Sequence, residues 1–163
     1  MTRFARLTPV RLAGLVLAIV LLAACAPTTT GDRSNPYRAG VDGPATVRAG
    51  GTVYVRVDVP RAVFGLTQED LGMRLTPWGP NLSRATVTPL FELRDVVVPD
   101  GWDLTLDRAV AYLSATRPEA EVEATLRVSV PEGARLGGQR VRAVLVDQRD
   151  RRHAFEFVVQ VGS

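Results

Sequence analysis

Two residue types that often carry chemistry occur once each in this chain of 163 residues, as Cys25 and His153. Cys25 follows an uncharged apolar run, and it has no second cysteine with which to form an intramolecular disulfide. His153 ends a charged stretch, residues 148–153, that is typical of a hairpin between the last two strands. A catalytic triad needs a buried, oriented histidine, and a zinc site needs several His or Cys ligands. We therefore expect a solvated His153 and no metal or cofactor.

Three carboxylates surround Trp102 in the sequence, and they are Asp100, Asp103 and Asp107. Carboxylate oxygens suit calcium, and a pair of carboxyl groups could act on a glycosidic bond. The spacing matches no familiar calcium loop, however, and alternating Asp residues are common at the end of a strand. A single small domain also offers no evident cleft, so we expect no catalytic residues and a non-enzymatic protein.

The beginning of the chain has the pattern of an export signal. Arg3, Arg6 and Arg11 precede an apolar run, Leu12 to Ala24, which contains no charge. This run is shorter than the roughly 20 apolar residues that a membrane-spanning helix needs. The following Leu22-Ala23-Ala24-Cys25 resembles the lipobox of bacterial lipoproteins. An ordinary secretory signal, cleaved at another Ala, and an uncleaved anchor remain alternatives.

The lipobox resemblance implies that acyl chains such as palmitate are attached at Cys25 and that the chain is cleaved before this residue. Two or three acyl chains hold a protein stably on a bilayer, whereas one binds only marginally. The expected protein is an exported lipoprotein of the cell envelope. It would be tethered to the outer membrane or to the outer face of the cell membrane.

Charge argues against a nucleic-acid partner. The signal peptide takes three of the 20 basic residues with it, which leaves 17 basic side chains against 17 acidic ones. A nucleic-acid-binding domain would carry a clustered basic face. Every basic residue is Arg, scattered over expected strands and loops alike.

Composition divides the chain into three parts. Residues 1–24 form the signal peptide. Residues 25–44 contain the candidate lipidated Cys25 and a segment rich in Pro, Gly, Thr, Ser, Asn and Asp, which predicts a flexible tether that lets the domain stand off the bilayer. Tyr37 could pack on the domain or make only a local contact. Residues 45–163 are enough for one domain with one core.

From residue 45 the chain shows short runs that alternate between apolar and polar side chains, a pattern typical of strands. Strong alternation occurs at 52–59, 121–130 and 155–161, and further strands are expected at 45–48, 84–88, 90–98, 102–107, 109–114 and 140–146. Each sheet then has one buried and one wet face, which favours an all-β, immunoglobulin-like antiparallel β-sandwich. Residues 107–116 could instead form one or two helical turns.

Within this domain, Pro99-Asp100-Gly101-Trp102, the strand at 121–130, and Pro131 to Gly137 leading into another strand are similar to the accessory module associated with bacterial alpha-galactosidases (NEW3 type). The similarity spans about residues 90–161. It implies a sandwich fold, and it implies an accessory role rather than one particular activity.

The segment from Pro60 to Asn81 is the unusual insertion, and it contains Trp78. Residues 67–71 in it could form a helical turn capped by Thr67. Trp78 or Trp102 could stack on a sugar ring or contact a partner protein, although a place for Trp78 as a plug at the end of the sandwich is the more favoured alternative. We therefore weigh two functions: a lipid-anchored binding or structural protein with an envelope partner, and a carbohydrate-binding module.

Overall fold

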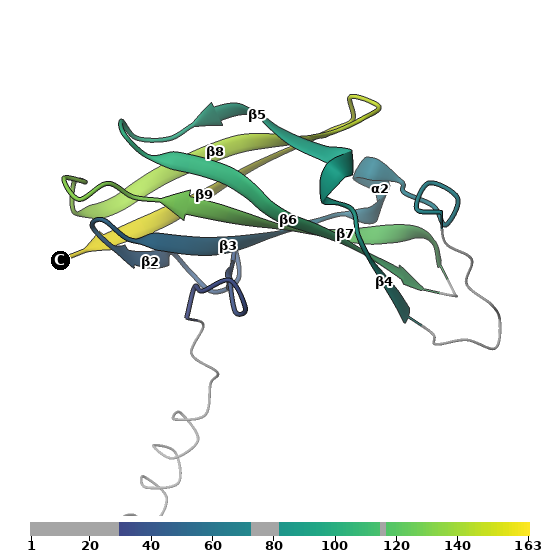
Figure 1. Ribbon diagram of the computed structural model, residues 1–163, viewed down its shortest axis with the longest axis horizontal. Helices are drawn as coiled ribbons and strands as arrows, with labels where there is room; N and C mark the ends of the chain where they lie inside the picture. The colour runs from purple at the N-terminus through teal and green to yellow at the C-terminus, as the bar shows by residue number, and fades with distance from the viewer. Residues whose placement is uncertain (1–29, 73–81, 115–116) are drawn as a thin grey trace, which may run out of the picture.

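The computed structural model describes residues 30–72, 82–114 and 117–163, so Cys25 and Trp78 lie outside the described residues. The elements are β1 (Tyr37–Arg38), β2 (Ala45–Arg48), β3 (Thr52–Val59), α2 (Arg61–Phe64), β4 (Leu82–Thr86), the 3-10 turn η2 (Thr88–Leu90), β5 (Phe91–Val97), β6 (Asp103–Ser114), β7 (Arg117–Ser129), β8 (Gly137–Asp147) and β9 (Arg152–Gly162). Figure 1 shows them as an elongated, twisted sandwich.

Two sheets form the sandwich within the described ranges. One has the order β1-β3-β7-β6-β4 and the other β2-β9-β8-β5. The predicted all-β sandwich is confirmed. The expectation of purely antiparallel sheets is wrong, because β1 pairs with β3 and β2 pairs with β9 in parallel. Both parallel pairs lie at sheet edges and are formed by the first segments of the described chain.

The helical alternative for residues 107–116 is also wrong. Residues 103–114 form one strand, β6, in place of the two short strands that were expected. Its pairing with β7 shifts between Leu106 and Arg108, which leaves Asp107 as a bulge. Before the bulge the even-numbered residues Leu104 and Leu106 face the core. After it the odd-numbered Ala109 faces the core, because the bulge inserts one extra residue. That change of parity is what resembled a break between two elements.

The segment before β2 contacts the sandwich, although its composition predicted a tether. Tyr37 pairs with Val55 of β3, and the ring of Tyr37 packs against the core. The amide N–H of Ala39 donates to the carbonyl oxygen of Arg56 at 2.9 Å. The chain therefore joins the domain well before Ala45, and Tyr37 takes the packing role that the sequence left open.

The inner faces of the two sheets form two adjoining apolar clusters. One contains Trp102 with Val55 of β3 and Val159 of β9, and the other contains Leu113 of β6 and Leu145 of β8. The insertion contributes Phe64, which is 1% exposed and whose ring centroid lies 4.9 Å from that of Phe91. Part of the insertion is thus core. In the part of the chain that the structure describes, no helix is long and apolar enough to cross a membrane.

Candidate functional site

The most organised polar region lies at the hairpin that joins β8 to β9, residues 147–151. The amide of Asp147 donates to the carbonyl oxygen of Arg151 at 3.1 Å, and the amide of Asp150 donates to the carbonyl oxygen of Asp147 at 3.0 Å. Asp150 has φ 59°, in the left-handed region that Gly, Asn and Asp tolerate best. A type I turn followed by such a residue is a common hairpin connection.

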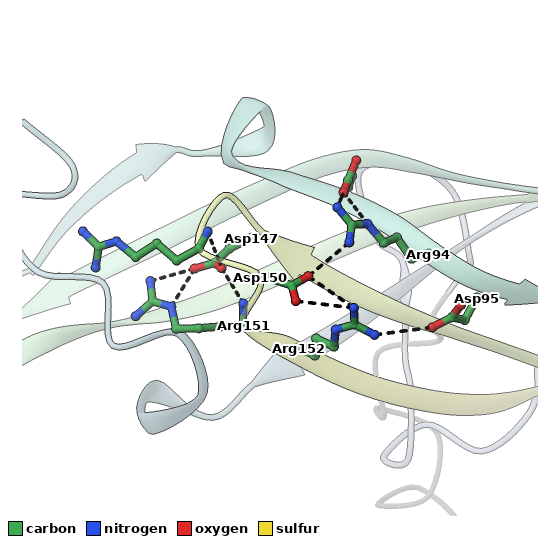
Figure 2. A network of polar contacts seen from close by, with 8 residues as sticks. Arg94, Asp95, Asp147, Asp150, Arg151 and Arg152 are labelled. Carbon is green, nitrogen blue, oxygen red and sulfur yellow. Dashed lines mark hydrogen bonds and ion pairs between the residues drawn. The ribbon is translucent and has the colours of Figure 1, made fainter.

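The carboxylate of Asp147 holds this hairpin from inside. It accepts hydrogen bonds from the amides of Arg149 (3.0 Å) and Arg151 (2.9 Å), and from the Nε of Arg151 at 2.7 Å, as Figure 2 shows. Asp147 is only 6% exposed. Burial raises the pKa of Asp147. The hydrogen bonds from Arg151 and Arg149 and the charge of the Arg151 guanidinium lower it, and because their combined effect is larger than that of burial, the pKa lies below the usual value.

A second set of charges lies on the outer side of the hairpin. The guanidinium of Arg94 on β5 donates to Asp150 at 3.1 Å and also pairs with Glu92. Arg152 reaches Asp150 at 3.3 Å and Asp95 at 4.0 Å (Figure 2). These side chains are about half exposed, so each pair contributes little stability. Together they tie the hairpin to the edge strand β5.

The hairpin is also tied to the insertion. Arg149 pairs with Asp70, whose carboxylate accepts the backbone N–H of Thr67 at 2.9 Å and the Thr67 hydroxyl at 3.0 Å. The hydrogen bond from the Thr67 amide is the main reason that the pKa of Asp70 is lowered, and Arg149 adds to it. Residues 68–72 form a turn and no regular helix. The amide of Leu71 donates to the carbonyl oxygen of Thr67 at 3.3 Å and the amide of Asp70 donates to the Thr67 hydroxyl at 3.4 Å, as expected for one turn capped by Thr67.

A cleft of about 300 Å³ opens beside the hairpin, between η2, β5 and the 147–150 turn. Leu90 and Phe91 provide apolar lining, and Glu92, Asp147 and Asp150 provide carboxylates. A smaller hollow of about 140 Å³ continues toward Asp70 and shares Leu90 and Asp147 with the cleft. We call this region, with the hairpin, the hairpin cleft. Its charged groups are paired with one another, an arrangement that shapes a surface more readily than it activates a nucleophile.

The structure separates the residues that the sequence suggested as sites. Trp102 is 8% exposed and lies in the core, so its predicted role as a stacking platform is not supported. Cys25 and Trp78 lie outside the described residues. Asp107 accepts a hydrogen bond from the Nε of Arg33 at 2.9 Å. Among the described residues, Asp100, Asp103 and Asp107 included, no three metal-ligating side chains are grouped.

The sequence predicted that His153 lies in the turn, but the structure places it on strand β9. It pairs with Leu145 of β8 and is partly buried, because the turn ends at Arg151 and the strand begins one residue later. Burial lowers the pKa of His153, so that the neutral imidazole is favoured. Asp147 was not predicted as a site residue from the sequence. The signal that could have indicated it is its place at the end of the apolar run 143–146, four residues before Arg151.

One family model matches the chain. Residues 93–146 match the NPCBM-associated, NEW3 domain of alpha-galactosidase. The matched residues run from β5 through β6 and β7 into the end of β8, and they lie inside the span of the predicted similarity. No curated protein matches the chain. The fold and the match together support a β-sandwich with a NEW3-like module, which is a class of accessory domain.

Proposed function

We propose that this protein is a lipid-anchored, non-enzymatic component of the cell envelope and that its β-sandwich binds another envelope protein. The observation that carries the proposal is the match of residues 93–146 to the NEW3 domain, an accessory domain associated with alpha-galactosidase. Two strands in the matched range, β5 and β8, also line the hairpin cleft. The anchor is inferred from the lipobox-like Leu22 to Cys25.

The hairpin cleft is the proposed contact surface for that partner. An apolar centre with a polar rim is the usual composition of a protein interface. Here Leu90 and Phe91 supply the apolar part, while Arg94 and Asp150 lie at the rim. The buried carboxylate of Asp147 keeps the turn rigid, which lowers the entropy cost of binding.

The anchor is tested by measuring the intact mass of the protein from purified membranes, with Cys25→Ala as the comparison. We expect the wild-type chain to begin at Cys25 with acyl chains added, and the variant to lose both the acyl mass and the membrane association. An unacylated, freely soluble wild-type chain would contradict the proposed anchor.

The partner is tested by cross-linking in cells with a photoreactive amino acid at one of two exposed glutamines. Gln148 lines the hairpin cleft, whereas Gln160 lies near the end of β9 and does not line the cleft. We expect one envelope protein to be recovered in stoichiometric amount from position 148 and not from position 160. Recovery of the same proteins from both positions would mean that the cleft is not the contact surface.

A further inference from the structure

The described chain is fixed to the sandwich from its first residues. The carbonyl oxygen of Gly31 accepts the backbone N–H of Tyr54 on β3 at 2.8 Å. The amide of Gly31 donates to the carbonyl oxygen of Asn35 at 3.0 Å, which closes a turn, and Tyr37 then pairs with Val55. We call residues 31–43 the entry surface.

The start of this surface is closely packed. Gly31 has φ +70°, and a Cβ built there would lie 2.4 Å from the ring of Tyr37. The carboxylate of Asp32 accepts the hydroxyls of Ser34 at 2.6 Å and Thr30 at 2.7 Å, and also the amides of Asn35 and Ser34. These bonds, the hydroxyl donors first, hold the pKa of Asp32 well below its usual range. Only a residue without a side chain fits at Gly31, so the docking is specific to this backbone.

The docking point sets how far the sandwich can stand from an anchor at Cys25. From Cys25 to Gly31 the chain makes six residue steps, which reach about 20 Å at most, whereas a tether free as far as Ala45 would reach about 70 Å. We propose that the sandwich lies against the membrane, with the entry surface facing the lipid headgroups. This inference rests on the proposed lipid anchor at Cys25.

The side chains of the entry surface suit that position. Val41 is 61% exposed in the turn between β1 and β2, where Gly40 and Gly43 have positive φ. The side chains of Arg33 and Arg38 are 67% and 46% exposed, although they pair with Asp107 and Asp42. Because these charges balance, the short chain to Cys25, rather than attraction to anionic headgroups, holds the surface on the bilayer. Salt should therefore leave the orientation unchanged.

The orientation has a consequence for the proposed partner. In Figure 1 the entry surface, drawn in purple below β2 and β3, and the tip of the β8–β9 hairpin lie on opposite sides of the sandwich. A membrane on the entry surface therefore leaves the tip of the β8–β9 hairpin on the far side of the sandwich from the lipid (Figure 1), where a partner can reach it.

The test uses the full-length lipoprotein, purified from membranes and reconstituted into vesicles of phosphatidylethanolamine and phosphatidylglycerol that carry a nitroxide on some headgroups. Val41→Cys and Gln148→Cys are labelled separately with a fluorophore. Cys25 is the only cysteine of the natural chain, so an acylated protein offers the introduced thiol alone for labelling. We expect several-fold stronger quenching at position 41 than at position 148, at low and high salt.

Two further changes test the length argument. Gly31→Ala and, separately, an insertion of about 20 Gly/Ser residues after Thr29 both lengthen the free chain, so quenching at position 41 should fall toward that at position 148. The insertion leaves every contact of the entry surface intact and serves as the control if Gly31→Ala disturbs the fold. Equal, weak quenching at both positions of an acylated protein would overturn the inference and leave the anchor standing. An unacylated mass would overturn the anchor and the inference together.

Discussion

Replacing Asp147 with Ala should destabilise the sandwich more than the loss of any surface carboxylate. The change removes the acceptor for two backbone amides and the Arg151 guanidinium. Breaking a buried ion pair costs about 3–5 kcal/mol. The Arg151 side chain is 28% exposed and can recover some solvation, so we expect a loss of about 2–3 kcal/mol.

The assay is urea unfolding of the purified protein, followed by far-UV circular dichroism, which reports the loss of the two sheets. Glu156→Gln is the matched control, because Glu156 pairs with Arg142 at 2.6 Å but is 42% exposed. The control should cost less than about 1 kcal/mol. If Asp147→Ala costs no more than the control, the argument that this carboxylate holds the hairpin is refuted.

Acid should reduce the difference between wild type and Asp147→Ala. The pKa of Asp147 is lower in the folded protein than in the unfolded chain, so its contribution is fully present above the unfolded value of about 4. It is lost as the pH falls from there through the folded pKa. The free energies of unfolding of the two proteins should therefore converge below about pH 4, and a constant difference down to the lowest accessible pH would contradict the assignment.

Two other substitutions test the hairpin and the insertion. Asp150→Gly should leave the stability within about 0.5 kcal/mol, since relief of the left-handed strain offsets the loss of two exposed ion pairs, whereas Asp150→Ala should cost about 1 kcal/mol more than the Gly variant. Equal unfolding midpoints for the two variants would remove the backbone argument. Phe64→Ala should cost about 3–5 kcal/mol, because the ring is fully buried against Phe91, and a loss below 1 kcal/mol in the same urea assay would show that the insertion is not part of the core.

The regular strands could be predicted from the sequence because alternation records which side chains face the core. Residues 45–48 and 52–59 are strands with the predicted bounds, and Val53, Val55 and Val57 point inward. Strand β6 could not be predicted as one element, because the bulge at Asp107 reverses the parity of its inward residues. Periodicity in one strand carries no information about such an extra residue.

Contacts between distant segments could not be predicted from the sequence for a related reason. The composition of residues 31–38 is that of a linker, and their docking depends on a hydrogen bond from Tyr54 and on packing of one ring, Tyr37. The burial of Asp147 depends in the same way on Arg151 folding back over it. Charge patterns alone made this hairpin look solvated, because they do not show which carboxylate lies inside the turn.

The pairing of β2 with β9 also constrains when the protein can fold. Ala45 pairs with Val159, so the edge of one sheet joins residues more than a hundred positions apart. Such long-range pairing slows folding, since the chain must close a large loop before the contacts form. During synthesis, which starts at the N-terminus, the sheet β2-β9-β8-β5 cannot be completed before β9 has been made. The inner face of the other sheet therefore stays partly uncovered until β9 has been synthesised.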